Sequence, residues 1–176
     1  MRALMLRFSH TFILLLVLGC VSSPPHSPTE SSLDTLLVSR GYIPIPLQKV
    51  SSGHLILKSE INGVPGMLIL DSGASVTFID SAASKALSLR DIEETSIPAI
   101  GLGPTGTAKT AVLGSLVIGP LTFRNRPVFL LDLTELTKVI GLMSGQKIYG
   151  VLGQDIFESH SAIIDIRNRL LYLKPE

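Results

Sequence analysis

Residues 67–75 read MLILDSGAS, an apolar run that ends in an acid, a hydroxyl and a glycine. The apolar residues 67–70 predict a buried strand, which presents Asp71 at the tight turn that follows. Gly73 has no side chain, so a substrate or a partner subunit can approach the backbone of this turn closely. The motif occurs once in the chain. A site that needs two such carboxylates would therefore take them from two chains.

The composition predicts one β-rich domain with a tail. The chain has 176 residues, and it is poor in aromatic residues (Phe 6, Tyr 3, Trp 0), so its apolar content is mainly leucine, isoleucine and valine. Residues 1–19 contain two basic residues and no acid, and the remaining residues carry 13 basic and 14 acidic side chains, a net charge of −1. This balance gives no basic face for nucleic acid and no lysine-rich run for docking on anionic lipid.

The first twenty residues have the features of an export signal. Arg2 and Arg7 form a basic start, residues 11–18 form an apolar core too short to span a bilayer, and Gly19-Cys20 follows. The run VLGC resembles the lipobox of bacterial lipoproteins, with valine at its first position instead of the usual leucine. The resemblance implies a signal peptide over residues 1–19, a lipid on Cys20, and anchoring in the bacterial cell envelope, on the periplasmic side or in the outer membrane. An ordinary secretory peptide cleaved near Gly19 is the alternative.

A linker and a single folded domain are expected after the signal. Residues 20–32 contain Cys20 and a Ser/Pro-rich stretch that has almost nothing to bury, so we expect an extended linker. Residues 33–176 are expected to form the domain. Its apolar segments are short and separated by turn residues, which predicts an all-β barrel or sandwich with little helix.

Strands are expected at residues 54–61 and 66–70, joined by a hairpin at Asn62-Gly63. Two prolines within residues 42–47 confine that extended segment to the edge of a sheet. Further strands are expected at residues 76–79, 110–118, 121–131, 149–153, 161–166 and 170–173. Asp80 is expected to cap a brief helix over residues 81–87. Residues 97–106 predict a glycine-rich loop, residues 134–145 a loop or short helix, and residues 154–159 a helical turn.

Four features in this order resemble the retropepsin-like aspartic proteases, in the exported bacterial form that has one lobe per chain. The resemblance covers roughly residues 42–174. Asp71-Ser72-Gly73 matches the Asp-Thr/Ser-Gly motif of that family. The run GVLGQDIF at residues 150–157 resembles its second signature, residues 162–173 resemble its last hairpin, and residues 101–106 lie where such proteins carry the flap.

The resemblance implies an all-β, retropepsin-like closed barrel lobe with one or two short helices, which pairs as a two-fold homodimer. Each chain would donate Asp71 to one site that hydrolyses peptide bonds in a peptide or protein substrate, without a cofactor or a metal. Ser72 and Gly73 would support the active-site turn. The second signature would supply Val151, Leu152 and Gly153, and a flap containing Gly101, Leu102, Gly103 and Gly106 would cover the substrate.

Other interpretations of these residues are weaker. Asp71 alone could be a strand-end residue that makes an Asx turn with its own backbone. The run GLGPTG at residues 101–106 matches the dinucleotide-binding fingerprint, but a proline interrupts it and β-type sequence follows instead of a helix. His54 and His160 lack partners at metal-ligand spacing, so we expect no zinc site. The main alternative is a membrane-tethered module of the same fold that grips peptides without cutting them. Deep burial of Asp71 without a facing partner carboxylate would favour it, and so would a flap too short to cover the groove.

Overall fold

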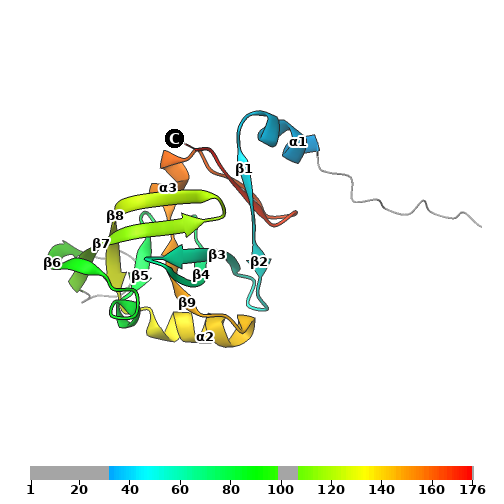
Figure 1. Cartoon of the computed structure of the whole chain (residues 1–176). Helices are drawn as coiled ribbons and strands as arrows, with labels where there is room; N and C mark the ends of the chain where they lie inside the picture. Colours follow the sequence, from blue (N-terminus) through cyan, green and yellow to red (C-terminus); the bar gives the residue numbers. More distant parts are fainter. Residues whose placement is uncertain (1–31, 99–106, 176) are drawn as a thin grey trace, which may run out of the picture.

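The computed structural model of the protein describes residues 32–98 and 107–175. In these ranges the strands are β1 (Ile43–Pro46), β2 (Gln48–Lys49), β3 (Leu55–Ile61), β4 (Val64–Leu70), β5 (Phe78–Asp80), β6 (Arg90–Pro98), β7 (Thr107–Ile118), β8 (Leu121–Leu131), β9 (Ile148–Leu152), β10 (Ile163–Asp165) and β11 (Leu170–Leu173). The helices are α1 (Ser32–Ser39), α2 (Thr134–Ser144), α3 (Gln154–Ser159) and the short 3₁₀ helix η1 (Ser81–Ala83) (Figure 1).

The larger sheet closes on itself and forms a barrel. Its strand order is β2-β3-β4-β9-β5-β8-β7-β6, and β3 also pairs with β7. Closure therefore runs through six strands: β3, β4, β9, β5, β8 and β7. Fully buried side chains from these strands fill the interior, among them Leu57, Leu68, Leu113 and Leu152. The expected closed β-barrel lobe is confirmed.

The β3–β4 hairpin shows why the sequence folds this way locally. Burial alternates along the second half of β3, as expected for a strand with one face on the core. Asn62 and Gly63 both have positive φ, at 50° and 82°, which is the conformation that a two-residue hairpin with matching twist requires. The Asn62 side chain donates to the carbonyl of Leu87 at 2.8 Å and accepts from the amide of Ser115 at 2.9 Å. The turn is thereby tied to the barrel wall.

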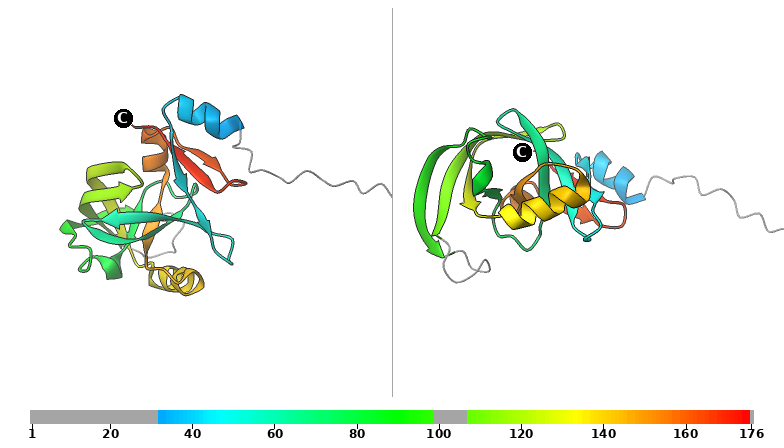
Figure 2. Two further views of the ribbon diagram at one scale, coloured as in Figure 1. Left: turned by 45° about the vertical axis from the view of Figure 1, so that its right-hand side comes forward. Right: turned by 90° about the horizontal axis from the view of Figure 1, so that it is seen from below.

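A second sheet of three strands lies beside the barrel, in the order β1-β11-β10. The two prolines of β1 are tolerated because β1 pairs on one side only, with β11. The expected closing hairpin is present as β10 and β11. Figure 2 shows this sheet and α1 at one end of the molecule and α2 at the other.

Several elements differ from the expectation. Helix α1 was not predicted. A residue far away in the sequence holds it in place, because Tyr172 of β11 donates a hydrogen bond to Asp34 at 3.0 Å. Strand β6 was not predicted either, and it contains the first two residues of the expected loop at 97–106. The helix after Asp80 is shorter than expected, although the Asp80 side chain does accept the Ala82 amide. None of the helices within residues 32–98 and 107–175 has the length and apolar character needed to cross a membrane.

Candidate active site

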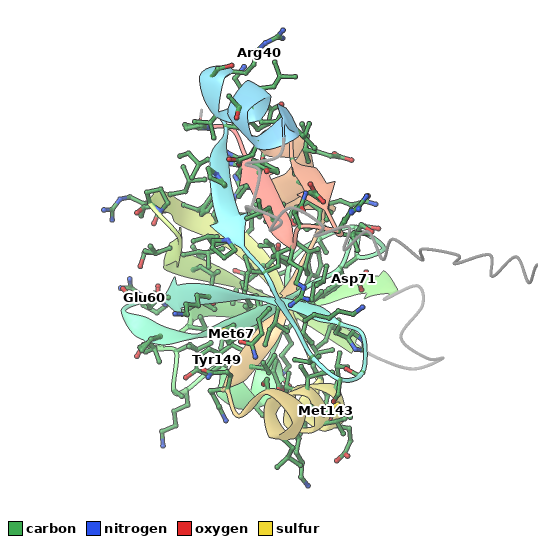
Figure 3. All side chains as sticks on the ribbon, turned by 90° about the vertical axis from the view of Figure 1, so that its right-hand side faces the viewer. Arg40, Glu60, Met67, Asp71, Met143 and Tyr149 are labelled. Atoms are coloured by element: carbon green, nitrogen blue, oxygen red, sulfur yellow. The ribbon has the colours of Figure 1, made fainter. Side chains whose placement is uncertain are left out.

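Asp71 lies directly after β4, at the mouth of the barrel. Its backbone amide donates to the carbonyl of Leu152 at 3.2 Å, which extends the parallel pairing of β4 with β9 by one residue. The side chain is exposed. Figure 3 shows Asp71 midway between the α1 end, marked by Arg40, and the α2 end, marked by Met143. The condition that would favour the non-cleaving module, deep burial of Asp71, is not met within this chain.

A hydrogen bond fixes the orientation of the Asp71 carboxylate. The amide of Gly73 donates to Asp71 Oδ1 at 2.8 Å, and the amide of Ala74 donates to the Asp71 carbonyl at 3.2 Å. The Asx turn of the alternative interpretation is therefore present. It is compatible with catalysis, because it holds one oxygen in place, and within the described residues no hydrogen bond is made to Oδ2.

The second signature holds this turn from the other side of the barrel mouth. The backbone amide of Gln154 donates to the carbonyl of Ala74 at 2.8 Å. The Gln154 side chain donates through Nε2 to the carbonyl of Ser72 at 2.7 Å. Two of the turn's carbonyls are thus bound by one residue that lies about 80 positions away in the sequence.

Thr77 joins the two loops below the carboxylate. Its hydroxyl donates to Asp155 Oδ1 at 2.7 Å and accepts from the amide of Gly153 at 3.2 Å. Thr77 is 1% exposed, so both bonds are shielded from water on the Thr77 side. A hydroxyl at this position satisfies one donor and one acceptor at once.

Two glycines allow the loops to approach so closely. A Cβ atom on Gly150 would lie within 3 Å of the backbone of Phe78 and Ile79, and one on Gly153 within 3 Å of the carbonyl oxygens of Ala74 and Val76. These neighbours are backbone atoms in the barrel wall and in the active-site turn, so they cannot swing aside. Glycine at both positions is a packing requirement.

The structure brings together most of the residues expected at the site. Asp71, Ser72 and Gly73 form the turn, and the buried residues Val151, Leu152 and Gly153 run beside it in and after β9. Sequence reasoning missed Thr77 and Gln154 as site residues, and it treated Asp155 only as the start of a helical turn. The hydroxyl of Thr77 within an apolar run was the one available signal.

The other strand-end acids are engaged in structural hydrogen bonds. Asp132 follows β8 and accepts the amide of Thr134 at 3.1 Å. Hydrogen bonds from the side chain and backbone of Thr134 lower the pKa of the Asp132 carboxyl from its usual value. Asp165 in the closing hairpin accepts both the amide and the side chain of Asn168, and these bonds lower its pKa in the same way. Each of these two carboxylates therefore caps its own turn.

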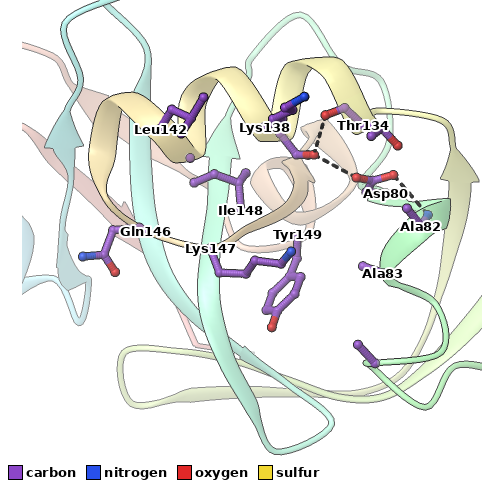
Figure 4. A pocket seen from close by; sticks show the side chains of 13 residues that line it. Asp80, Ala82, Ala83, Thr134, Lys138, Leu142, Gln146, Lys147, Ile148 and Tyr149 are labelled. Atoms are coloured by element: carbon purple, nitrogen blue, oxygen red, sulfur yellow. Dashed lines mark hydrogen bonds between the residues drawn. The ribbon is translucent and has the colours of Figure 1, made fainter.

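Asp80 lines a hollow of about 450 Å³ between η1, α2 and β9, which Asp71 does not reach. Both carboxyl oxygens of Asp80 are bound: Oδ1 accepts the amides of Ala82 and Leu133, and Oδ2 accepts the Thr137 hydroxyl at 2.8 Å. Figure 4 shows this network at one end of the hollow. The expected capping role of Asp80 is confirmed, and it extends to the start of α2.

Two groups of expected residues lie outside the described part of the chain. The flap residues Gly101, Leu102, Gly103 and Gly106 fall in the segment that connects β6 to β7. The signal peptide, Cys20 and the rest of the linker up to residue 31 precede the described residues, and Ser32, the last residue of the expected linker, begins α1. Within residues 32–98 and 107–175, no group of three or more His, Cys, Asp or Glu side chains could hold a metal ion.

Comparison with known proteins identifies the family. The sequence pattern of the family described as "Aspartyl protease" matches residues 57–156, more than half of the chain, from β3 into α3. The chain belongs to the aspartyl protease family. The matched span contains the Asp71 turn and residues 150–156 of the second signature, the two segments that the hydrogen bonds above join.

Three solved structures are similar to the chain, and the first of them supports the fold. A retropepsin-like aspartic protease from Rickettsia conorii is similar at a TM-score of 0.52 and 23% identity, over 76% of this chain and 89% of that chain. The retroviral protease-like domain of Ddi1 from Leishmania major gives a TM-score of 0.46 at 14% identity, over 76% of this chain and 91% of that one. The EIAV protease in complex with the inhibitor HBY-793 gives 0.43 at 16% identity, over 59% and 85%. No curated protein matches the chain. The retropepsin-like fold of this aspartyl protease family member is established by the first of these structures.

Proposed function

We propose that the protein is an aspartic endopeptidase whose catalytic residue is Asp71. The observation that carries the proposal is the exposed Asp71 carboxylate at the barrel mouth, with one oxygen held by the Gly73 amide. Membership of the aspartyl protease family supports hydrolysis of peptide bonds as the reaction. Thr77 and Gln154 act as positioning residues, because they hold the turn and not the substrate.

The chemistry requires a second carboxylate, and the proposal takes it from Asp71 of a second copy. Two carboxylates about 3 Å apart cannot both ionise, so they share one proton and titrate as a pair. The ionised member removes a proton from a water molecule held between them, and the protonated member polarises the scissile carbonyl. Asp132, Asp165 and Asp80 do not provide this partner within the chain, because each is engaged in its own local hydrogen bonds.

Other parts of the proposal concern the surroundings of the dyad. Ser72 is exposed beside Asp71, and in the proposed dimer its hydroxyl would brace the facing turn of the second subunit. The segment containing Gly101, Leu102, Gly103 and Gly106 would cover an extended peptide and exclude water from the reaction. Export and a lipid on Cys20 would tether the homodimer to the cell envelope, where its substrates would be exported or envelope peptides and proteins.

The first test is cleavage of a peptide library by the full-length chain in detergent, from acid to neutral pH. Asp71→Asn removes the carboxylate and keeps the shape, so cleavage should vanish while sedimentation still reports a dimer. Asp132→Asn is the matched control, a second exposed strand-end acid, and should cleave normally. Retained cleavage in Asp71→Asn would refute the assignment, and absence of cleavage from a folded wild-type dimer would favour the peptide-binding module.

Mixing subunits tests the origin of the second carboxylate. When wild type and Asp71→Asn are unfolded together and refolded in equal amounts, half of the wild-type subunits pair with a variant subunit. Activity per wild-type subunit should then fall to about half, because a mixed dimer has one carboxylate only. Unchanged activity per wild-type subunit would show that one chain suffices and would refute the shared dyad.

A further inference from the structure

Three arginines on two strands of the larger sheet have no acidic partner among the described residues. Arg90 begins β6, and Arg124 and Arg126 lie on β8, with β7 between the two strands. Within residues 32–98 and 107–175, no ion pair or hydrogen bond joins any of the three to a carboxylate. Unpaired arginines are ordinary on a surface, so their position relative to hollows in the surface matters more than their number.

Two adjoining hollows are lined by these arginines, and Arg124 is shared between them. The smaller hollow, about 180 Å³, lies where the β7–β8 hairpin meets the end of α3, and it is bounded by Arg124, Arg126, Phe123 and His160. The larger and shallower one, about 570 Å³, is bounded by Arg90, Arg124, Asn62 and Ser115. The ring of His160 packs edge-on against Phe123, with the ring centres 4.8 Å apart, and forms one wall of the smaller hollow. No aspartate or glutamate lines either hollow.

The Nε atom of Arg126 is buried and has no hydrogen-bond acceptor in the described part of the chain. The backbone explains its position. Phe123 and Val128 are both buried in the core although they are five residues apart, so the alternation of the strand breaks between them. The break occurs at Asn125, whose φ is +50°, and it leaves the Arg126 side chain half-buried beside the smaller hollow. A buried charged donor without an acceptor is costly, and an anion in the hollow would supply the acceptor.

The geometry points to a binding site for a phosphate group in this arginine-lined hollow, and we infer that this group is its ligand. Guanidinium groups present planar pairs of donors that match the oxygens of phosphate or carboxylate. Several positive charges without an acid favour a phosphate group, with a charge of about −1.5 to −2, over a singly charged carboxylate. The ligand is either free phosphate or the phosphomonoester headgroup of a phospholipid, which present the same chemistry. The site lies on the β7–β8 hairpin and does not include Asp71 or either signature loop.

Calorimetric titration of the full-length chain with inorganic phosphate, at constant ionic strength, tests the site. We expect saturable binding that weakens at least about tenfold in Arg124→Gln and in Arg126→Gln, and acetate should bind at least about tenfold more weakly than phosphate. Arg126→Lys keeps the charge but loses Nε, so its affinity should also fall. Arg40→Gln is the matched control, because it removes an exposed arginine at the end of α1 that borders neither hollow. Arg124 is exposed, so its variant remains informative if Arg126→Gln does not fold.

Vesicles distinguish the two sources of the group. Binding to vesicles of phosphatidic acid in phosphatidylcholine is compared between Arg124→Gln and Arg40→Gln, so that any contribution from the amino-terminal region cancels. Weaker vesicle binding by Arg124→Gln alone would assign the headgroup, and phosphate binding without that difference would assign free phosphate. The inference is overturned if folded wild type binds neither, if the Arg124 and Arg126 variants bind as wild type does, or if acetate binds as tightly as phosphate.

Discussion

Replacing Thr77 with valine should loosen the connection between the two loops of the site while leaving the shape of the core unchanged. Valine and threonine differ by a methyl for a hydroxyl, and Thr77 is 1% exposed, so packing is preserved. What is lost is the donor to Asp155 Oδ1 at 2.7 Å and the acceptor for the Gly153 amide at 3.2 Å. The effect therefore isolates the two hydrogen bonds of one hydroxyl.

The magnitude follows from the burial of the two partners. Gly153 is buried, and its amide would remain without an acceptor, which costs about 1–3 kcal/mol. Asp155 is half-buried, so water can replace much of the lost bond, and its contribution is below about 1 kcal/mol. Together these terms predict a loss of about 1–4 kcal/mol in the free energy of unfolding. With a urea dependence of about 2 kcal/mol per M, the unfolding midpoint falls by roughly 0.5–2 M.

The assay is urea unfolding of wild type, Thr77→Val and Thr77→Ser at one fixed protein concentration, because the stability of the proposed dimer would depend on concentration. Thr77→Ser keeps the hydroxyl and loses a buried methyl, so it should cost only about 1 kcal/mol. Peptide cleavage should fall in Thr77→Val more than in Thr77→Ser, since the Asp71 turn loses its support from Gly153. If Thr77→Val is no less stable than Thr77→Ser, the hydroxyl does not join the loops and the reasoning fails.

Two further predictions concern packing and pH. Gly150→Ala would place a methyl against the backbone of Phe78, where two central strands cannot separate. We therefore expect a loss of about 3 kcal/mol in the free energy of unfolding, measured by urea titration. A loss under about 1 kcal/mol would contradict the packing requirement. Burial, together with the hydrogen bond to Asp34, raises the pKa of Tyr172 to about 12 in the folded state. In the unfolded state the pKa of tyrosine is about 10, so the unfolded chain loses this proton at a lower pH than the folded chain does. Stability should therefore fall as the pH rises from about 10 to 12, and Tyr172→Phe should flatten that fall; an unchanged slope would show that Tyr172 does not contribute.

Local chemistry explains which parts of the fold the sequence predicted. Asn62-Gly63 adopts the positive φ values that its residue types favour, and the prolines of β1 exclude a central strand. The bounds of β8 and α3 agree with the expected segments, because each combines a clear apolar pattern with an unambiguous turn. The position of Asp71 after a strand followed from the same kind of local information.

The missed elements depend on partners far away in the sequence. Strand β6 is rich in charged and polar residues and is held by its pairing with β7. Helix α1 is short and directly follows a Ser/Pro-rich stretch, and Asp34 holds it through Tyr172, a contact between residues 138 positions apart. The hydrogen bond from Gln154 to the Ser72 carbonyl likewise joins residues that are far apart in the sequence. Side-chain identity alone does not encode such pairings, so they could not be predicted from single segments.

The joining of the two loops has a consequence for how the chain gains its chemistry during synthesis. The Asp71 turn leaves the ribosome early, but its braces, Gly153 and Gln154, follow about 80 residues later, and synthesis proceeds at roughly 5–20 residues per second. During this interval the Asp71 carboxylate lies on a turn without these hydrogen bonds, in a barrel that still lacks β9. A nascent chain therefore lacks the complete site. A truncated product without β9 and α3 would carry Asp71 in a turn that lacks the hydrogen bonds from Gln154. Under the proposed function, this order of the segments delays peptide cleavage until β9 and α3 have been synthesised.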